Sequence, residues 1–202
     1  MKLVGLFDSP YVRRVAVSMR LQGHAFEHVA LSVFRHVDEM RKFNPLIKVP
    51  MLILDSGEKL IESSFILDYL DGIAAPEKRL MPASGMARMQ IQQHCAVSLI
   101  AMEKAVQYYY ETGLRPAENT YHAWAERVLT QMHDAFALLE AMPESAVLSG
   151  AALTQADVSA AVALAFARYV HAAQFPSGRY PRLERLSSHC EALPEFIDTP
   201  LE

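Results

Sequence analysis

The first thirty residues constrain the fold most strongly, because they alternate two apolar segments with a turn and a helical pattern. Residues 2–7 (KLVGLF) are almost continuously apolar, as in a strand buried on both faces. Residues 12–21 carry apolar side chains with a helical period, and Gly23 is a suitable C-terminal cap. Residues 25–31 (AFEHVAL) have strand composition. This order predicts a βαβ unit with parallel strands and a right-handed crossover.

A hairpin and one more helix are expected to complete the first half of the chain. Residues 51–54 and 59–61 have strand composition on either side of the turn Asp55-Ser56-Gly57, which predicts an antiparallel pair. Apolar side chains then repeat with helical spacing from Ile61 to Leu70. The first half is therefore predicted to be βαβ followed by ββα.

The second half has a different apolar pattern, because every sizeable segment in it shows helical spacing. Thr154-Gln155-Ala156-Asp157 fits a capping box with Thr154 as the N-cap. The helix that this box opens is apolar almost all round, so we expect it to be the central buried helix. Helices are expected at about 86–112, 118–141, 154–174 and 182–192. The predicted organisation is an α/β domain at 1–75, a linker at 76–85 and an all-α helical bundle domain at 86–202.

Composition and charge exclude several classes of function. The net charge of −4 and the sequence pI of about 6.1 argue against nucleic acid or an anionic membrane as a partner, since either needs a basic face. The apolar segment 158–175 contains polar residues and falls short of the roughly 18 uninterrupted apolar residues of a membrane span. The two cysteines, Cys95 and Cys190, lie far apart, and no signal-peptide pattern is present. These features predict a cytoplasmic protein.

The corner Ser9-Pro10-Tyr11-Val12 lies where a thiol–disulfide oxidoreductase carries a reactive Cys-x-x-Cys pair, but neither thiol is present. Ser9 followed by Pro10 is a favoured way to begin a helix, and this interpretation needs no ligand. The same geometry also permits a functional interpretation. A helix N-terminus stabilises a bound thiolate, and a hydroxyl there can donate a hydrogen bond to it.

Two further segments admit both a structural and a binding interpretation. Val49-Pro50 is either a proline tolerated at a strand entrance or a cis peptide that turns the Val49 backbone toward an extended peptide. Ser63 is either a helix N-cap beside a surface acid, Glu62, or part of a pocket for a carboxylate in which Glu62 binds an ammonium. A carboxylate and an ammonium on one carbon form an amino-acid backbone. The two segments together therefore suggest a small peptide ligand.

The remaining polar clusters are expected to be structural. His24 and His28 are four residues apart, but an extended chain separates them by about 13 Å, so no metal site is predicted. Arg13-Arg14 is interpreted as an interdomain ion pair in preference to a phosphate clamp.

The whole chain resembles the bacterial cytosolic glutathione transferases of the serine type. The resemblance rests on four motifs, S-P-Y-V-R-R-V, N-P-L-I-K-V-P, I-E-S-S-F-I-L-D-Y-L and L-T-Q-A-D-V-S-A-A-V. It implies a thioredoxin-like N-terminal domain followed by an all-helical domain. It also implies glutathione as co-substrate, no metal, and a homodimer in which the first domain of one subunit meets the helical domain of the other.

The resemblance assigns roles to individual residues. Ser9 matches the catalytic serine that donates a hydrogen bond to the glutathione thiolate. The expected glutathione-binding residues are Val49 and Pro50 for the cysteinyl part, Glu62 and Ser63 for the γ-glutamyl part, and Lys48 and His36 near the glycyl carboxylate. A hydrophobic electrophile is expected to contact Phe7, Tyr11, Met102, Tyr108 and Tyr109.

The activity that these roles imply is attack of the glutathione thiolate on an electrophilic carbon. Two alternatives stay open. One is a glutathione-binding or protein-interaction module of the same fold without catalysis, and the other is a glutathione-dependent isomerase or peroxidase. No motif names the electrophile.

Overall fold

The computed structural model describes residues 1–143, 145, 148 and 150–201, and it divides the chain into two compact units. The first unit consists of Met1–Met81 and the C-terminal segment from Leu193, and the second unit is Pro82–Ala192. The predicted helical range 86–202 includes positions 144, 146–147, 149 and 202, which lie outside the described residues.

The first unit is built on a four-stranded mixed sheet with the strand order β2-β1-β3-β4. β1 pairs in parallel with β2 and antiparallel with β3, and β3 pairs antiparallel with β4. The predicted parallel pair and the predicted hairpin are therefore confirmed, with strands that are mostly shorter than expected. The strands are β1 (Lys2–Val4), β2 (Glu27–Val29), β3 (Met51–Ile53) and β4 (Lys59–Ile61).

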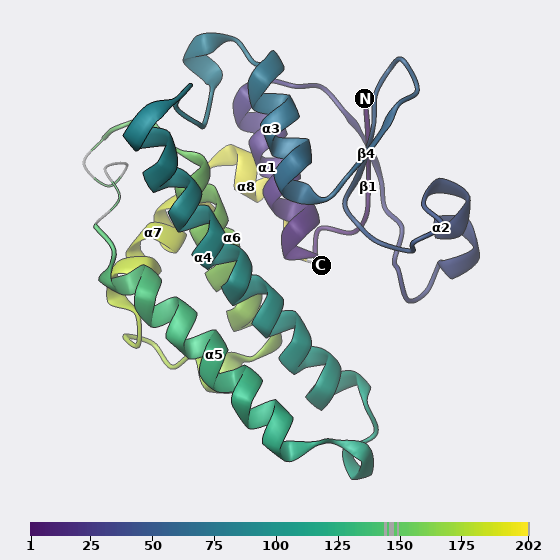
Figure 1. The fold of residues 1–202 in the computed structure, drawn as a ribbon, viewed down its shortest axis with the longest axis vertical. Helices are drawn as coiled ribbons and strands as arrows, with labels where there is room; N and C mark the ends of the chain where they lie inside the picture. The colour runs from purple at the N-terminus through teal and green to yellow at the C-terminus, as the bar shows by residue number, and fades with distance from the viewer. Residues whose placement is uncertain (144, 146–147, 149, 202) are drawn as a thin grey trace. The chain divides into compact units, whose positions relative to one another are not determined.

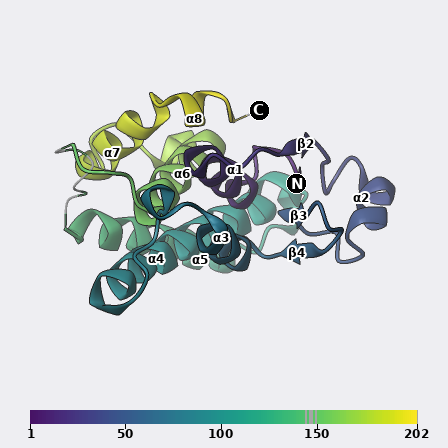
Figure 2. The same cartoon turned by 90° about the horizontal axis from the view of Figure 1, so that it is seen from above.

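Alternating side chains give this sheet two buried faces. Leu3 and Leu52 belong to a core that includes residues of α1 (Pro10–Gln22) and α3 (Ser63–Ile73). Val4 and Met51 belong to a second core that includes Met40 of α2 (Val37–Phe43). The sheet therefore lies between α1 and α3 on one side and α2 on the other (Figures 1 and 2).

Two short helices of this unit are absent from the sequence prediction. α2 has 7 residues, of which Met40 alone is buried, so its apolar pattern is too brief to show a helical period. α8 (Pro194–Ile197) is a single turn. Arg13 of α1 secures the C-terminal segment, because its Nε donates to the Thr199 carbonyl over 2.7 Å and its guanidinium lies 5.6 Å from the Phe196 ring centre. This contact explains why the segment belongs to the first unit.

The second unit is a helical bundle. α4 packs against α5 and α6, and α7 packs against α6 (Figure 1). Most of α6 is buried, and the backbone N–H of Thr154 donates to Asp157 Oδ2 over 2.7 Å, so the buried helix and its capping box are confirmed. The long helices are α4 (Gly85–Tyr109), α5 (His122–Ala141), α6 (Gln155–Val170) and α7 (Pro181–Glu191). Single turns lie at Ala117–Asn119 and Ala172–Gln174, and a π-helical turn, Tyr110–Leu114, follows α4; a further single turn, Pro76–Lys78, belongs to the first unit.

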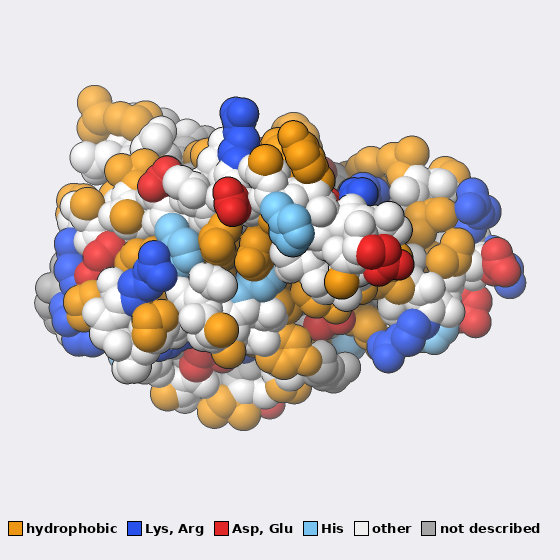
Figure 3. Space-filling view, turned by 90° about the horizontal axis from the view of Figure 1, so that it is seen from below, with side chains coloured by type: hydrophobic (Ala, Val, Ile, Leu, Met, Phe, Trp, Pro, Cys, Tyr) orange, Lys and Arg blue, Asp and Glu red, His pale blue; other side chains and the backbone are white. Residues whose placement is uncertain are grey.

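The surface carries charges of both signs. On the face shown in Figure 3, acidic and basic side chains are interspersed among hydrophobic and uncharged ones. Among the described residues, the helices lack a stretch of the length and apolarity that a bilayer crossing requires.

Candidate functional site

Ser9 lies at the N-terminal end of α1, where its hydroxyl oxygen accepts a hydrogen bond from the Val12 N–H over 3.4 Å. This cap bond is long, since such bonds are usually about 2.9–3.0 Å. It occupies a lone pair of the oxygen and leaves the hydroxyl hydrogen for another acceptor. Ser9 is half-buried. The cap interpretation is confirmed, and the same geometry lets the hydroxyl donate to an anion at the helix N-terminus.

Gly5 joins this corner to the Val49-Pro50 segment. Its φ of +130° is a conformation that residues with a side chain rarely adopt. A Cβ at this position would lie 2.6 Å from Val12 Cγ2 and 3.0 Å from Val49 Cβ. Val12 and Val49 therefore both pack closely against Gly5. The structure thus brings the head of α1 next to the segment expected to bind the cysteinyl part of the ligand.

The Val49–Pro50 peptide bond is cis, as the binding interpretation predicts. Pro50 is buried and Val49 is half-buried. Two residues earlier, Ile47 has a φ of 51°, which is rare for a β-branched residue. An unusual backbone therefore leads into the residue whose main chain is expected to contact the ligand.

Glu62, rather than Ser63, is the N-cap of α3, so the structural alternative for this segment is wrong by one residue. Glu62 has a φ of 70°, and its carboxylate accepts a hydrogen bond from the Ser64 N–H over 3.1 Å. Ser63 is the first helical residue and is only 1% exposed. Its hydroxyl accepts a hydrogen bond from Nη1 of Arg14 over 3.2 Å.

Arg14 therefore connects the Ser9 helix to the start of α3. It lies on α1, five residues after Ser9, and is buried. Its guanidinium places a positive charge beside Ser63, where a carboxylate is expected to bind. The sequence interpretation made Arg13-Arg14 an interdomain ion pair and gave neither residue this role within the first unit.

His36 and Lys48 lie beside α2. His36 is the residue before α2, and its Nδ1 accepts a hydrogen bond from the Ser32 N–H over 3.1 Å. Lys48 is exposed, and its carbonyl accepts a hydrogen bond from Asn44 Nδ2 over 2.8 Å. These contacts shape the loops around α2. A role for either side chain at a glycyl carboxylate stays a prediction.

The five residues expected to contact an electrophile differ in accessibility. Phe7 is 4% exposed, and its ring stacks on His28 with 3.8 Å between ring centres. Met102 is fully buried. Both are therefore core residues with little surface for a ligand, which corrects the expectation for them. Tyr11, Tyr108 and Tyr109 are half-buried.

Tyr108 and Tyr109 flank a buried histidine that the sequence interpretation missed. His171 Nε2 donates to the Ala105 carbonyl over 2.9 Å, and the Tyr108 ring meets the imidazole edge-on with 4.8 Å between centres. Burial lowers the pKa of His171, although its hydrogen bond to Ala105 opposes this effect. The imidazole of His171 therefore ties the segment after α6 to α4. Sequence gives no signal for this contact, because the partners are 66 residues apart.

The two cysteines of the chain are poor nucleophiles. Cys190 is fully buried, and burial raises the pKa of its thiol to about 12. Cys95 is buried as well. A thiol that reacts at the Ser9 corner must therefore come from a bound molecule. In the described part of the chain, His, Cys, Asp and Glu side chains do not gather into a group that could hold a metal ion.

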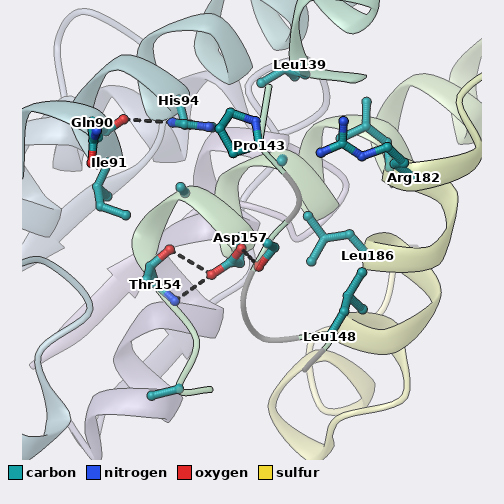
Figure 4. A pocket seen from close by; sticks show the side chains of 15 residues that line it. Gln90, Ile91, His94, Leu139, Pro143, Leu148, Thr154, Asp157, Arg182 and Leu186 are labelled. Atoms are coloured by element: carbon teal, nitrogen blue, oxygen red, sulfur yellow. Dashed lines mark hydrogen bonds between the residues drawn. The ribbon is translucent and has the colours of Figure 1, made fainter. Parts of the chain in front are cut away.

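The second unit contains a cavity of about 590 Å³ lined by residues of α4, α5, α6 and α7 and of the segment between α5 and α6 (Figure 4). Its charged side chains, Asp157 and Arg182, already form hydrogen bonds at the start of α6 and the end of α5. The Thr154 hydroxyl donates to Asp157 Oδ2 over 2.7 Å, and Arg182 Nη1 donates to the Glu140 carbonyl over 2.8 Å. The described lining does not include the tyrosines expected to contact an electrophile. The cavity is thus distinct from the predicted second-substrate pocket.

The first unit has a βαβ motif followed by a ββα motif, a mixed sheet and a cis-proline before β3, which define a thioredoxin-like domain. The helical bundle that follows is an all-helical domain. Two family models match these two parts. The model of the glutathione S-transferase N-terminal domain matches residues 3–78, and that of the C-terminal domain matches residues 123–187. The chain therefore belongs to the glutathione S-transferase family.

Solved structures share the fold over almost the whole chain. A glutathione transferase family member from Pseudomonas fluorescens, with bound glutathione, is 29% identical with a TM-score of 0.87, and the match covers 100% of this chain and 98% of that chain. A glutathione S-transferase from Methylobacterium radiotolerans, in complex with glutathione sulfonate, is 25% identical with a TM-score of 0.87. That match covers 98% of this chain and 93% of the other.

Curated relatives match over shorter stretches. The uncharacterized GST-like protein YibF of Escherichia coli is 35% identical over 71 residues, which are 35% of each chain. Glutathione transferase GST 23 of Zea mays is 32% identical over 90 residues, 44% of this chain and 40% of that one. This chain therefore matches less than half the length of either relative.

Proposed function

We propose that this protein is a glutathione transferase that activates the thiol of bound glutathione for attack on an electrophilic small molecule. The observation that carries the proposal is the Ser9 hydroxyl, which lies at the N-terminus of α1 with its hydrogen unused by the cap bond. Similar structures with glutathione or glutathione sulfonate bound support glutathione as the ligand.

Ser9 acts by favouring the thiolate over the thiol. Its hydroxyl donates a hydrogen bond to the sulfur anion, and the positive end of the α1 dipole adds to this stabilisation. Both effects lower the thiol pKa. Since the thiolate is the nucleophile, a larger fraction of bound glutathione is reactive at neutral pH. The thiolate electron pair then forms a sulfur–carbon bond. In a substitution the leaving group departs with the electrons of its bond to that carbon; in an addition the π electrons of an activated double bond move to the activating group, and the resulting anion takes a proton from solvent.

The rest of the proposed site binds the tripeptide. The Val49 backbone pairs with the cysteinyl part, and Ser63 with the α3 N-terminus binds the γ-glutamyl carboxylate beside the Arg14 guanidinium. Glu62 is exposed and binds the ammonium. Lys48 and His36 are proposed for the glycyl carboxylate, and Tyr11 of the first unit for a hydrophobic electrophile.

Calorimetric titration with glutathione, combined with thiolate absorbance against pH and turnover of an activated aryl chloride, tests the proposed function. We expect saturable binding, a bound thiol whose pKa lies below the free value of about 8.5, and turnover. Absence of binding would contradict the proposal. Binding without turnover would favour the non-catalytic module, whereas turnover confined to an olefinic acid or a hydroperoxide would favour the isomerase or the peroxidase.

Ser63→Ala is expected to weaken glutathione binding by about 1–3 kcal/mol, because it removes a partner of the bound carboxylate. It also removes the Ser63 hydroxyl from buried Arg14, so the free energy of unfolding should fall as well. Calorimetry and urea unfolding measure the two effects separately. Ser64→Ala, which removes the neighbouring, more exposed hydroxyl, is the matched control. Equal glutathione affinity in folded Ser63→Ala and wild type would remove Ser63 from the site.

A homodimer is proposed on the same resemblance, and α3 presents a suitable surface. Phe65, Tyr69 and Ile73 recur every four residues on its outer face and are 73%, 37% and 50% exposed. An exposed apolar stripe of this kind marks an interaction surface.

Phe65→Asp is therefore expected to convert the dimer into a monomer, because the carboxylate would be buried without a partner. Sedimentation at micromolar concentration should give twice the chain mass for wild type and 22.6 kDa for the variant. Phe34→Asp is the control, since Phe34 is also exposed, at 56%, but lies outside this stripe. A wild-type mass of one chain would rule out the proposed dimer.

A further inference from the structure

We propose that His28 is a positioning residue for Ser9, fixing the segment that leads from β1 into α1. The proposal rests on the proposed function of Ser9 as the donor to the glutathione thiolate. Two separate contacts of one imidazole carry it, one with the main chain at Gly5 and one with the ring of Phe7.

The first contact replaces a missing hydrogen bond of the sheet. The Gly5 N–H donates to the Val29 carbonyl over 3.0 Å, and in a regular parallel ladder the Gly5 carbonyl would accept from the Leu31 N–H. The Leu31 N–H instead donates to the Val29 carbonyl over 2.9 Å. His28 Nε2 lies 2.7 Å from the Gly5 oxygen, and it must be the donor because a carbonyl oxygen only accepts. A side chain therefore supplies the donor where the strand pairing ends.

The second contact fixes the chain closer to Ser9. The Phe7 and His28 rings are nearly parallel, with an interplanar angle of 7° and 3.8 Å between centres. Phe7 lies two residues before Ser9, and the Ser9 N–H closes a turn by donating to the Leu6 carbonyl over 3.2 Å. The His28 side chain on β2 thus contacts the chain at two points, Gly5 just before this turn and Phe7 within it.

The position of this turn matters because a hydrogen bond to sulfur weakens steeply when its length or angle changes. Gly5 also contacts Val12 just after Ser9 and Val49 in the proposed cysteinyl segment. A shift of the Gly5 peptide would therefore change the distance between the Ser9 hydroxyl and the bound sulfur. His28 sets that distance without touching the ligand.

The test separates the two contacts of His28 by substitution. His28→Phe retains a ring to stack on Phe7 but has no N–H donor. His28→Gln has no ring but retains an N–H donor, its side-chain amide, at a similar distance from the backbone. His24→Phe is the matched control. His24 Nε2 also donates to a carbonyl of the first unit, that of Leu70 over 3.1 Å, away from the turn at Ser9. Thiolate absorbance of bound glutathione against pH is measured with kcat and KM.

We expect His28→Phe to raise the pKa of the bound glutathione thiol by about 0.5–1. At a pH below that pKa, the thiolate fraction and kcat should both fall by about three- to tenfold. The KM for glutathione should stay within about twofold, because the residues that bind the rest of the tripeptide are unchanged. His28→Gln, which keeps the donor and loses the ring, should lose less of the thiolate fraction than His28→Phe, and His24→Phe should match wild type. If His28→Phe does not fold, His28→Asn, whose amide is too short to reach Gly5, is measured with the same expectation.

Two results would overturn the proposal. One is an unchanged thiol pKa in a folded variant that lacks the Gly5 bond, and the other is an equal loss in His24→Phe. A wild-type protein that binds glutathione without lowering its thiol pKa would instead contradict the function proposed for Ser9. The two failures are therefore distinguishable.

Discussion

Ser9→Cys is expected to lose most of the addition activity and to gain glutathione-dependent reduction of small mixed disulfides. The substitution removes the hydroxyl proposed to stabilise the glutathione thiolate. It also places a thiol at the N-terminus of α1, where the pKa of a cysteine falls well below its free value of about 8.5. This thiol would lie beside the bound glutathione sulfur and could form a mixed disulfide with it. Val12 supplies no second thiol, so the gained reaction should proceed through a single cysteine.

Ser9→Ala is the control for this change of reaction class. Loss of one donor to a developing or bound anion typically costs about 10²–10³ in kcat, so Ser9→Ala should lose the addition activity and gain no reductase activity. Both activities are measured side by side on wild type and both variants, and intact-protein mass detects the glutathione adduct. Because Cys190 and Cys95 are buried, an adduct at either is not expected. If Ser9→Cys forms no adduct, Ser9 does not face the sulfur and acts only as a helix cap.

The sequence predicts those elements of the fold that have a clear apolar pattern or a turn motif beside them. The parallel pair of β1 and β2, the hairpin of β3 and β4 and the buried α6 with its capping box are all confirmed. The short helices α2 and α8 escape prediction because so few residues cannot establish a helical period.

The site is predictable from sequence only where a motif marks it. Ser9, the cis bond at Val49-Pro50 and the start of α3 follow from local patterns or from the resemblance to a family. The bond between Arg14 and Ser63 joins residues 49 positions apart, and His28 lies 23 positions from Gly5 and 21 from Phe7, so no local pattern reports these contacts. Burial of Phe7 also depends on this tertiary packing, because its ring is covered by His28.

Gly5→Ala is expected to have the largest effect on stability, because the new methyl group has no space. It would lie 2.6 Å from Val12 Cγ2 and 3.0 Å from Val49 Cβ, on a backbone with a φ of +130°. Overpacking costs about 1–3 kcal/mol, and an unfavourable backbone conformation costs about as much again. The free energy of unfolding should therefore fall by about 2–6 kcal/mol. Glutathione affinity should fall too, since Val12 and Val49 flank the proposed position of the sulfur.

Gly72→Ala is the matched control, because a Cβ on Gly72 in α3 meets no atom within 4 Å and its φ is not positive. Alanine has the higher helix propensity, so this variant should be as stable as wild type or more stable by up to about 1 kcal/mol. Urea unfolding and calorimetric titration with glutathione are compared for wild type and both variants. A Gly5→Ala protein as stable as Gly72→Ala would show that Val12 and Val49 do not close on Gly5. Full stability loss with unchanged glutathione affinity, measured at a temperature where the variant is folded, would instead separate the packing at Gly5 from the binding of the thiol.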